Sequence, residues 1–167
     1  MGVKEHKKQA PKSLKIGIIT MSSTRTIETD ESGAWMRKRA NKEGHEIVSH
    51  IVVSDNEEEI RKTIRDSIRG NDPDVLLMTG GTGIGDADVT IEAVTPMLRK
   101  ELTSFAPVFA QLSLGQVDSA AIISRSTAGI INNTLVFCLP GSLKACKLAC
   151  KALIFPEVNH LVKHIRE

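Results

Sequence analysis

Runs of apolar residues alternate along the chain with stretches in which apolar residues recur every third or fourth position. Four of the runs are rich in aliphatic and β-branched residues, as in strands that are covered on both faces. They lie at residues 14–21, 46–53, 74–79 and 134–139. A less regular run at residues 120–125 predicts a fifth strand.

The stretches between these runs show the 3.6-residue periodicity of amphipathic helices. The clearest covers residues 56–69, where Asn56 is a suitable N-cap, three glutamates occupy the first turn, and isoleucines recur at every fourth position. Another helix is expected at residues 33–43, ended by Gly44. In the second half of the chain, helices are expected at residues 90–100 with an interruption at Pro96, at 104–115, at 142–154 with Ser142 as N-cap, and at 157–166.

Strand–helix–strand units repeat in the first half of the chain, and such units produce parallel strands joined by right-handed crossovers. The sequence therefore predicts an α/β fold: a single-domain, three-layer α/β/α sandwich with a mostly parallel, doubly wound sheet and helices on both faces. We expect this domain to span residues 14–167. Residues 1–13 are predicted to form a mobile basic arm.

Composition narrows the class of protein without identifying it. A chain of 167 residues with 41% hydrophobic and 25% charged residues is long enough for one globular domain. The formal net charge is +2, but residues 1–15 carry five lysines and one glutamate, a net +4, which leaves −2 for the rest. Because the positive charge lies in the arm and the aromatics are only four Phe and one Trp, we expect no nucleic-acid partner.

Targeting signals and cysteines suggest the compartment. No apolar run approaches the roughly 18 residues of a membrane span, and the arm lacks the apolar segment of a signal peptide. We therefore expect no membrane partner and a cytoplasmic location. The three cysteines, Cys138, Cys146 and Cys150, are odd in number and close in sequence, which fits a reducing compartment without a disulfide framework.

Polar residues follow the predicted strands at the points where the strands end. Open parallel sheets bind ligands outside the carboxyl ends of their strands, so these segments form the candidate site. In chain order they are Ser22–Arg25 with Asp30, Ser32 and Gly33; Ser54 and Asp55; Thr79–Asp88; and Pro140–Lys144. We expect their hydroxyls, glycines, carboxylates and cationic groups to converge on one edge of the sheet.

The segment after the third strand is rich in glycine. Four glycines within residues 80–85 let the backbone approach a ligand closely and point several N–H groups at one anion, although a flexible turn is the alternative. The segment has neither the lysine of a P-loop nor the G-x-G-x-x-G spacing of a dinucleotide fingerprint. It therefore predicts a phosphate-binding loop of another kind.

Three aspartates, Asp55, Asp86 and Asp88, supply negative charge near this loop. Carboxylates beside phosphates make sense when a divalent cation such as Mg²⁺ lies between them. The alternative is helix capping, by Asp86 and Asp88 at Thr90 and by Asp55 at the next helix. Lys144, in the first turn of a helix, is either a solvated surface lysine or a contact for a phosphate or carboxylate.

Two pairs of potential metal ligands are weaker candidates. His160 and His164 are four residues apart, as metal ligands can be, but the glutamate of H-E-x-x-H is missing, so a solvated helix face is favoured. Cys146 and Cys150 share a helix face without C-x-x-C spacing, which favours core packing over zinc.

Three ordered motifs together resemble a known family. They are TGGTGIGDADVTIEA at residues 79–93, ISRSTAG at 123–129 and LPGSLKA at 139–145. The chain from about Leu14 to its C-terminus resembles the MoaB/Mog domain of molybdenum cofactor biosynthesis. The resemblance implies molybdopterin adenylyltransferase activity: Mg²⁺-ATP donates AMP to the terminal phosphate of molybdopterin and releases pyrophosphate. It also implies a homotrimer or homohexamer and contact with the molybdenum-insertion enzyme.

The resemblance assigns roles to individual residues. It implies that Asp55 and Asp88 are the catalytic aspartates, with Asp88 holding Mg²⁺. The substrate- and nucleotide-binding residues that it implies are Ser22, Thr79, Gly80, Gly81, Thr82, Gly83, Ser124, Arg125, Pro140, Gly141, Ser142 and Lys144. The chain departs from the family at Ser23, where many members have a carboxylate. The alternatives are a non-catalytic molybdopterin-binding or scaffold protein and, disfavoured by the missing fingerprint, a Rossmann-type oxidoreductase.

Overall fold

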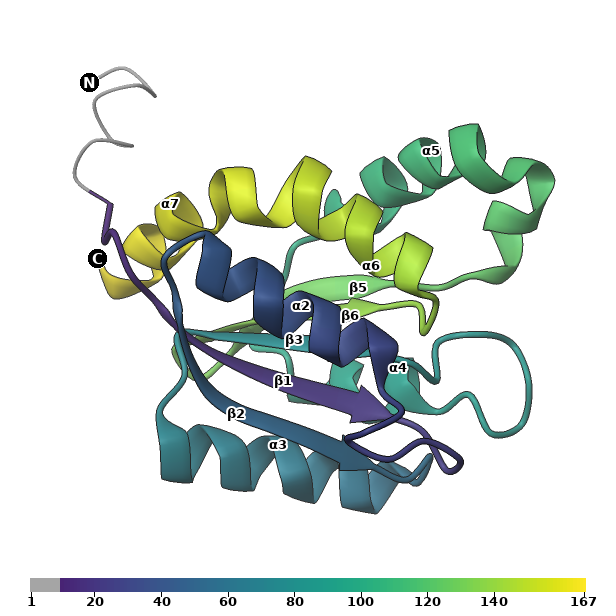
Figure 1. The fold of residues 1–167 in the computed structure, drawn as a ribbon, viewed down its shortest axis with the longest axis horizontal. Helices are drawn as coiled ribbons and strands as arrows, with labels where there is room; N and C mark the ends of the chain where they lie inside the picture. The colour runs from purple at the N-terminus through teal and green to yellow at the C-terminus, as the bar shows by residue number, and fades with distance from the viewer. Residues whose placement is uncertain (1–9) are drawn as a thin grey trace.

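A computed structural model describes residues 10–167 as a six-stranded sheet covered by helices on both faces (Figure 1). The strand order is β2-β1-β3-β6-β5-β4. The strands are β1 (Lys15–Met21), β2 (Glu46–Val53), β3 (Val75–Thr79), β4 (Lys100–Glu101), β5 (Thr127–Ile131) and β6 (Thr134–Leu139). β1, β2, β3 and β6 are parallel, while β5 runs antiparallel to both β6 and β4.

The helices form one layer on each side of the sheet, as predicted for a three-layer α/β/α sandwich. One layer holds α2 (Glu31–Lys42), α5 (Phe105–Val117), α6 (Leu143–Ala149) and α7 (Phe155–Arg166), and the other holds α3 (Glu57–Asn71) and α4 (Thr90–Val94). Short helical segments η1 (Thr95–Met97), η2 (Asp118–Ile123) and η3 (Cys150–Ile154) complete the chain.

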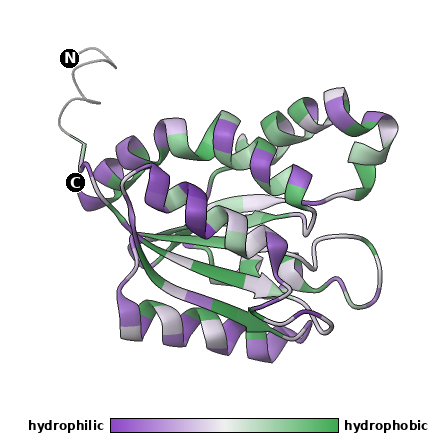
Figure 2. Cartoon of the chain, viewed as in Figure 1, coloured by the Kyte–Doolittle hydropathy of each residue, from purple (hydrophilic) through white to green (hydrophobic). Residues whose placement is uncertain are grey.

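The two faces of each central strand contribute to two separate cores. Ile18 and Leu77 face the core under α2 and α6, whereas Ile19 and Met78 face the core over α3 and α4. All four side chains are fully buried. Figure 2 shows the central strands as hydrophobic and the outer surface of α3 as largely hydrophilic. The strands lack a polar face because helices cover both sides of the sheet.

Side chains at the helix starts confirm the predicted N-caps. The side chain of Asn56 accepts a hydrogen bond from the N–H of Glu59 at 3.0 Å, and that of Ser142 accepts one from Ala145 at 3.1 Å. Asp30 caps α2 in the same way by accepting from Gly33 at 2.9 Å. These bonds satisfy N–H groups that the first helical turn leaves without a partner.

The second half of the chain differs from the prediction. Residues 120–125 were predicted as a strand, but most of them belong to the 3₁₀ helix η2, and the strand begins at Thr127. β5 and β6 form a tight hairpin with Ile131 opposite Thr134, and Asn132 at the turn has a positive φ of 53°. Asparagine tolerates this left-handed conformation, so the Asn132-Asn133 pair is the turn signal that the prediction did not use.

Helix boundaries also differ from the prediction near Pro96 and Pro156. The predicted helix at residues 90–100 ends with η1, and Lys100 and Glu101 form the short strand β4 instead. The two helices predicted at 142–154 and 157–166 are continuous, because the π-helical segment η3 connects α6 to α7. Pro156 lies in the first turn of α7 and has no N–H, so one hydrogen bond to the preceding turn is missing where the π-helical segment η3 meets α7.

The amino-terminal segment is described only from residue 10. Residues 1–9 of the predicted basic arm lie outside the described residues. The side-chain amide of Asn159 donates a hydrogen bond to the carbonyl oxygen of Pro11 at 2.6 Å, so the chain already contacts α7 at that point. Within residues 10–167, no helix combines the length and the hydropathy that a membrane crossing requires.

Candidate functional site

The loops after β1, β2, β3 and β6 converge at one edge of the sheet, as predicted. They enclose a pocket of about 260 Å³, here called the polar pocket. Its lining residues are Thr20, Met21, Ser22, Thr24, Arg25, Asp55, Gly80, Gly81, Ala87, Asp88 and Gly141. Both predicted catalytic aspartates therefore lie in one cavity with part of the glycine-rich turn, although they are 33 positions apart in the chain.

Asp55 is held in the polar pocket by the loop after β1. One carboxylate oxygen of Asp55 accepts hydrogen bonds from both the backbone N–H and the hydroxyl of Ser23, each at 2.9 Å. Asn56 caps α3, so the alternative that Asp55 caps this helix is wrong. Ser23 is thus a hydrogen-bond donor to Asp55 and adds no second negative charge beside this carboxylate.

The glycine turn is fixed by its neighbours. Gly80 and Gly81 have positive φ values of 100° and 63°, and a Cβ atom on Gly80 would lie 2.2 Å from the carbonyl oxygen of Met21. The Gly80 N–H donates to Leu139 O at 3.0 Å, and its carbonyl accepts from the Thr90 hydroxyl at 2.8 Å. Glycine is thus required at position 80 for close approach, and hydrogen bonds to Leu139 and Thr90 hold this part of the turn.

Asp88 turns back toward its own loop. Its carboxylate accepts a hydrogen bond from the N–H of Gly85 at 2.9 Å, while α4 starts without a side-chain cap. Capping of α4 by Asp88 is therefore wrong. Asp86, in contrast, is exposed and does not line the polar pocket.

Arg125 forms hydrogen bonds that hold the loop carrying Asp88 in place. Its guanidinium donates to the carbonyl oxygens of Thr82, Gly83 and Asp88 at 3.0–3.2 Å and forms an ion pair with Glu92 at 2.5 Å. The hydrogen bond from Arg125 lowers the pKa of the Glu92 carboxyl and raises that of the guanidinium, so both groups are charged at neutral pH. Arg125 lines neither pocket at this edge, and the structure gives it a positioning role.

The two predicted threonines lie behind the glycine turn. Thr79 is fully buried, and its hydroxyl donates to Pro140 O at 2.8 Å and lies 3.1 Å from the Cys146 sulfur. Thr82 is also buried, with 3% of its surface exposed. Burial raises the pKa of Cys146 to about 11, so this thiol is neutral and a poor nucleophile.

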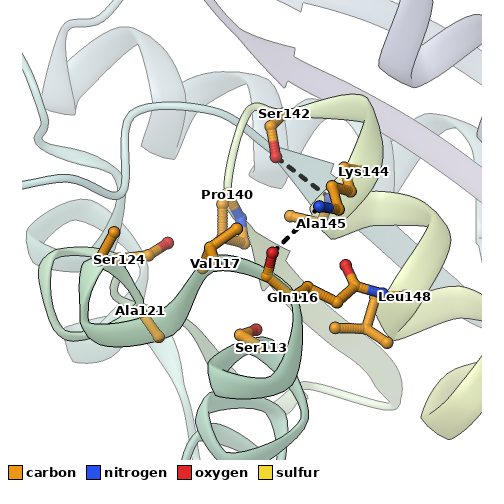
Figure 3. A pocket seen from close by; sticks show the side chains of 11 residues that line it. Ser113, Gln116, Val117, Ala121, Ser124, Pro140, Ser142, Lys144, Ala145 and Leu148 are labelled. Atoms are coloured by element: carbon orange, nitrogen blue, oxygen red, sulfur yellow. Dashed lines mark hydrogen bonds between the residues drawn. The ribbon is translucent and has the colours of Figure 1, made fainter.

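A second pocket lies beside the first, between α5–η2 and the start of α6 (Figure 3). This apolar pocket has a volume of about 230 Å³. Its lining residues are Ser113, Gln116, Val117, Ala120, Ala121, Ser124, Pro140, Ser142, Lys144, Ala145 and Leu148. The Lys144 ammonium donates to the carbonyl oxygen of Gln116 at 3.1 Å across its mouth, so Lys144 faces this pocket and not the glycine turn.

Residues 140–142 connect the two pockets. Gly141 lines the polar pocket, whereas Pro140 and Ser142 line the apolar one. The hydroxyl of Ser32 donates to Gly141 O at 3.0 Å and fixes this segment against the start of α2. Eight of the twelve predicted binding residues are thus divided between two adjacent cavities, and Thr79, Thr82, Gly83 and Arg125 line neither of them.

The carboxylates could hold a cation only with help from a ligand. Among the described residues, no group of three or more His, Cys, Asp or Glu side chains is placed to hold a metal ion. The polar pocket offers two carboxylates, Asp55 and Asp88. Two carboxylates completed by phosphate oxygens and water suit Mg²⁺, which rarely has a full set of protein ligands.

Comparison with known proteins decides the family. The model of a family described as "Probable molybdopterin binding domain" matches residues 17–160. The chain belongs to this family. Molybdenum cofactor biosynthesis protein B of Bacillus subtilis is 45% identical over 168 residues, covering 100% of this chain and 99% of that protein. The Escherichia coli K12 protein of the same name is 37% identical over 145 residues, covering 87% and 85%.

Solved structures of similar proteins share the architecture of this chain. A crystal structure of a molybdenum cofactor biosynthesis protein B has a TM-score of 0.90 and 40% identity, covering 95% of this chain and 99% of that one. The tungsten cofactor synthesizing protein MoaB from Pyrococcus furiosus has a TM-score of 0.85 and 38% identity, covering 95% and 100%. The predicted α/β fold and the resemblance to the MoaB/Mog family are both confirmed.

Some residues that line the two pockets were not predicted. Ala121, Ala145 and Leu148 are apolar residues on helices, and nothing in their sequence pattern distinguishes a pocket wall from a buried helix face. Thr20 forms part of the polar pocket, and its hydroxyl donates to the buried carboxylate of Asp30 at 2.6 Å. Its position at the end of β1 is a signal that could have identified it.

Proposed function

We propose that the chain is a molybdopterin adenylyltransferase of molybdenum cofactor biosynthesis. Membership of a molybdopterin binding family and relatives named for molybdenum cofactor biosynthesis support the pathway. The observation that carries the reaction is the convergence of Asp55, Asp88 and the glycine turn in a polar pocket that adjoins an apolar one. Such a pair of cavities suits a substrate with both a phosphate and a ring system.

The proposed reaction joins two phosphate groups. An oxygen of the terminal phosphate of molybdopterin attacks the α-phosphorus of ATP, a new P–O bond forms, and the bond from the α-phosphorus to the β-bridging oxygen breaks. Pyrophosphate leaves with the electron pair of that bond, and AMP remains on the pterin phosphate. Since the nucleophile belongs to the substrate, no protein nucleophile is needed, which agrees with the neutral, buried Cys146.

The polar pocket would place the two polyanions. The backbone of Gly80 and Gly81 approaches a phosphate without hindrance from side chains, and Arg25 supplies positive charge. Asp55 and Asp88 would hold Mg²⁺, and Mg²⁺ supplies charge neutralisation on the triphosphate. Ser23 keeps the Asp55 carboxylate oriented, and Arg125 keeps the loop of Asp88 in place.

The apolar pocket would bind the pterin ring. Ala121, Ala145 and Leu148 offer aliphatic surface, while Ser124 and Ser142 lie among them as hydrogen-bonding groups. Most small-molecule pockets combine an apolar wall with a few polar groups in this way. With the ring placed there, the terminal phosphate would extend past residues 140–142 toward Gly141 and the polar pocket.

An assay of the complete reaction tests the proposal. Purified protein is incubated with molybdopterin, ATP and Mg²⁺, and adenylylated molybdopterin and pyrophosphate are measured by mass spectrometry and a coupled assay. We expect equal amounts of both products and none in the presence of EDTA. Molybdopterin binding without ATP consumption would instead identify the non-catalytic binding or scaffold protein, and absence of molybdopterin binding would contradict both functions.

Exposed apolar side chains on α5 and η2 support association with further subunits. The cytoplasmic location is part of the proposal and does not follow from this surface. Val108, Leu114 and Ile122 expose 42%, 53% and 87% of their surface, which is unusual for large apolar side chains in one region. We propose that a homotrimer or homohexamer covers this surface and that the molybdenum-insertion enzyme receives the adenylylated product. Sedimentation equilibrium measures the assembly directly.

A further inference from the structure

A buried pair of polar side chains, Asp30 and His50, lies between β2 and the start of α2. The Asp30 side chain is fully buried, and the His50 side chain, in the middle of β2, is 8% exposed. His50 lines neither the polar nor the apolar pocket. Because charged side chains are rarely buried without partners, the remaining contacts of this pair are informative.

Asp30 joins three elements of the fold. Its Oδ2 atom accepts a hydrogen bond at 2.6 Å from the hydroxyl of Thr20, near the end of β1, and lies 2.8 Å from Nε2 of His50. Its Oδ1 atom accepts from the N–H of Gly33 at 2.9 Å and so caps α2. Since these partners belong to β1, β2 and α2, the carboxylate fixes the start of the helix relative to both strands.

The imidazole of His50 serves Asp30 through one nitrogen. Burial raises the pKa of the Asp30 carboxyl, but hydrogen bonds from His50, Thr20 and Gly33 outweigh burial and hold the pKa below its ordinary value. The carboxylate is therefore charged at neutral pH and only accepts hydrogen bonds, which places a proton on Nε2 of His50. The other ring nitrogen, Nδ1, is buried and has no hydrogen-bond partner among the described residues. Donation to Asp30 is thus the polar contact that this ring provides.

The first turn of α2 connects this pair to the pockets. Ser32 lies in that turn, and its hydroxyl donates to Gly141 O at 3.0 Å. Gly141 lines the polar pocket and belongs to the segment that connects the two pockets. A Cβ atom on Gly33 would lie 2.4 Å from Nε2 of His50, so glycine at this position lets the ring approach the same turn. A displacement of this turn would therefore also displace Gly141.

We infer that His50 is a positioning residue for adenylyl transfer, an inference that rests on the proposed function. His50 donates to Asp30, and Asp30 fixes the first turn of α2. From that turn, Ser32 holds Gly141, past which the attacking phosphate of the pterin would extend. A displaced Gly141 would misalign this phosphate with the α-phosphorus of ATP, so His50 acts on the rate without touching a substrate.

Substitution of His50 separates positioning from a merely structural role. His50→Leu removes the donor, and we expect kcat to fall by about tenfold while the KM for molybdopterin stays within about twofold of wild type. His50→Gln can place an amide N–H near the position of Nε2, so it should recover most of the rate. His45→Leu is the matched control: it replaces another buried histidine, just before β2, and should lower stability without lowering kcat.

Ser32→Ala tests the connection between the pair and the pockets. It should lower kcat by a factor similar to that of His50→Leu, and the double variant should lose no more than either single variant, because both substitutions act on the same path. Multiplied losses in the double variant would overturn the inference. An equal fall in kcat for His45→Leu, or a lack of recovery in His50→Gln, would also overturn it.

Nuclear magnetic resonance tests the same path without the reaction. The N–H of Ser142 shares its peptide group with the Gly141 carbonyl, so its chemical shift reports the hydrogen bond from Ser32. We expect this signal to move in His50→Leu and in Ser32→Ala, and to keep its wild-type position in His50→Gln and His45→Leu. An unmoved signal in His50→Leu would overturn the inference even where wild type transfers AMP. A moved signal without transfer in wild type would contradict the proposed function and support the placement of Gly141 by His50.

Discussion

The polar and apolar pockets adjoin each other but are built in different ways. The polar pocket consists of backbone turns and short side chains at strand ends, and hydrogen bonds between distant segments fix it, such as Ser23 to Asp55 and Gly80 to Leu139. The apolar pocket consists of side chains from helices, and the hydrogen bond that crosses its mouth joins Lys144 to Gln116. A rigid cavity suits phosphate chemistry, whereas a cavity between helices suits recognition of a ring.

This difference should separate the two kinetic constants. Substitutions around the polar pocket should lower kcat, because they disturb groups that act on the reacting phosphates. Substitutions in the apolar pocket should raise the KM for molybdopterin, because they remove binding that is equal in ground and transition states. Variants that mix the two effects would show that the pockets act as one site.

Asp88→Asn should have the largest effect. The amide keeps the size of the side chain but removes the charge that would hold Mg²⁺, so we expect kcat to fall by about a thousandfold, with molybdopterin binding retained. Single-turnover assays and calorimetric titration with molybdopterin measure the two quantities. The matched control is Asp86→Asn in the same loop, whose exposed side chain lies outside the pocket and whose activity should equal wild type. Equal losses in both variants would contradict the role of Asp88.

Arg125→Met tests positioning without direct contact to substrate. Methionine retains much of the aliphatic volume but loses the bonds to the Thr82, Gly83 and Asp88 carbonyls, so the loop that carries Asp88 should move. We expect kcat to fall between about tenfold and a hundredfold, with little change in the KM for molybdopterin. Arg125→Lys should recover part of the rate. A raised KM with unchanged kcat would instead make Arg125 a substrate-binding residue.

Ala145→Leu tests the apolar pocket. The added carbons occupy space that the pterin ring would need, and overpacking of this kind costs about 1–3 kcal/mol. We expect the KM for molybdopterin to rise by about tenfold while kcat and the KM for ATP remain unchanged. Ala152→Leu, an exposed position after α6, is the matched control and should leave all three constants unchanged.

The polar pocket was more predictable from the sequence than the apolar one. Parallel strands bring their carboxyl ends to one edge, so the segments around Asp55, Gly80 and Gly141 could be grouped from strand positions alone. The walls of the apolar pocket depend on how α5 and α6 pack, and periodicity does not specify that distance. The first half of the fold was predicted for a similar reason, since β1 and β2 are each followed by a helix with a side-chain cap.

Motifs were less informative about roles than about positions. Arg125 occurs in a family motif, but its guanidinium bonds to loop carbonyls, which no motif could indicate because the partners are backbone atoms. The error at residues 120–125 has a different cause. Apolar residues in Ala120–Ile123 are exposed on the 3₁₀ helix η2, except Ala121, so their hydrophobicity reflects surface and pocket rather than a buried strand.

The smallest predicted effect concerns Asp30, whose carboxylate accepts a hydrogen bond from Thr20 of the polar pocket. Burial raises the pKa of the Asp30 carboxyl, but hydrogen bonds from His50, Thr20 and Gly33 outweigh it and hold the pKa below its ordinary value. The unfolded chain therefore binds this proton more readily than the folded chain. The stability that Asp30 contributes is complete above the ordinary aspartate pKa of about 3.9 and is lost as the pH falls through the lower pKa of the folded state.

Asp30→Asn should consequently cost about 1 kcal/mol of unfolding free energy at pH 7 and progressively less below pH 4. Urea unfolding of both proteins between pH 3 and pH 7 measures this difference. Because Thr20 lies between Asp30 and the polar pocket, acid should also lower the protection factors for amide exchange at the end of β1 before it affects those of α6. A stability difference that stays constant across this range would show that Asp30 stabilises the pocket by packing and not by its charge.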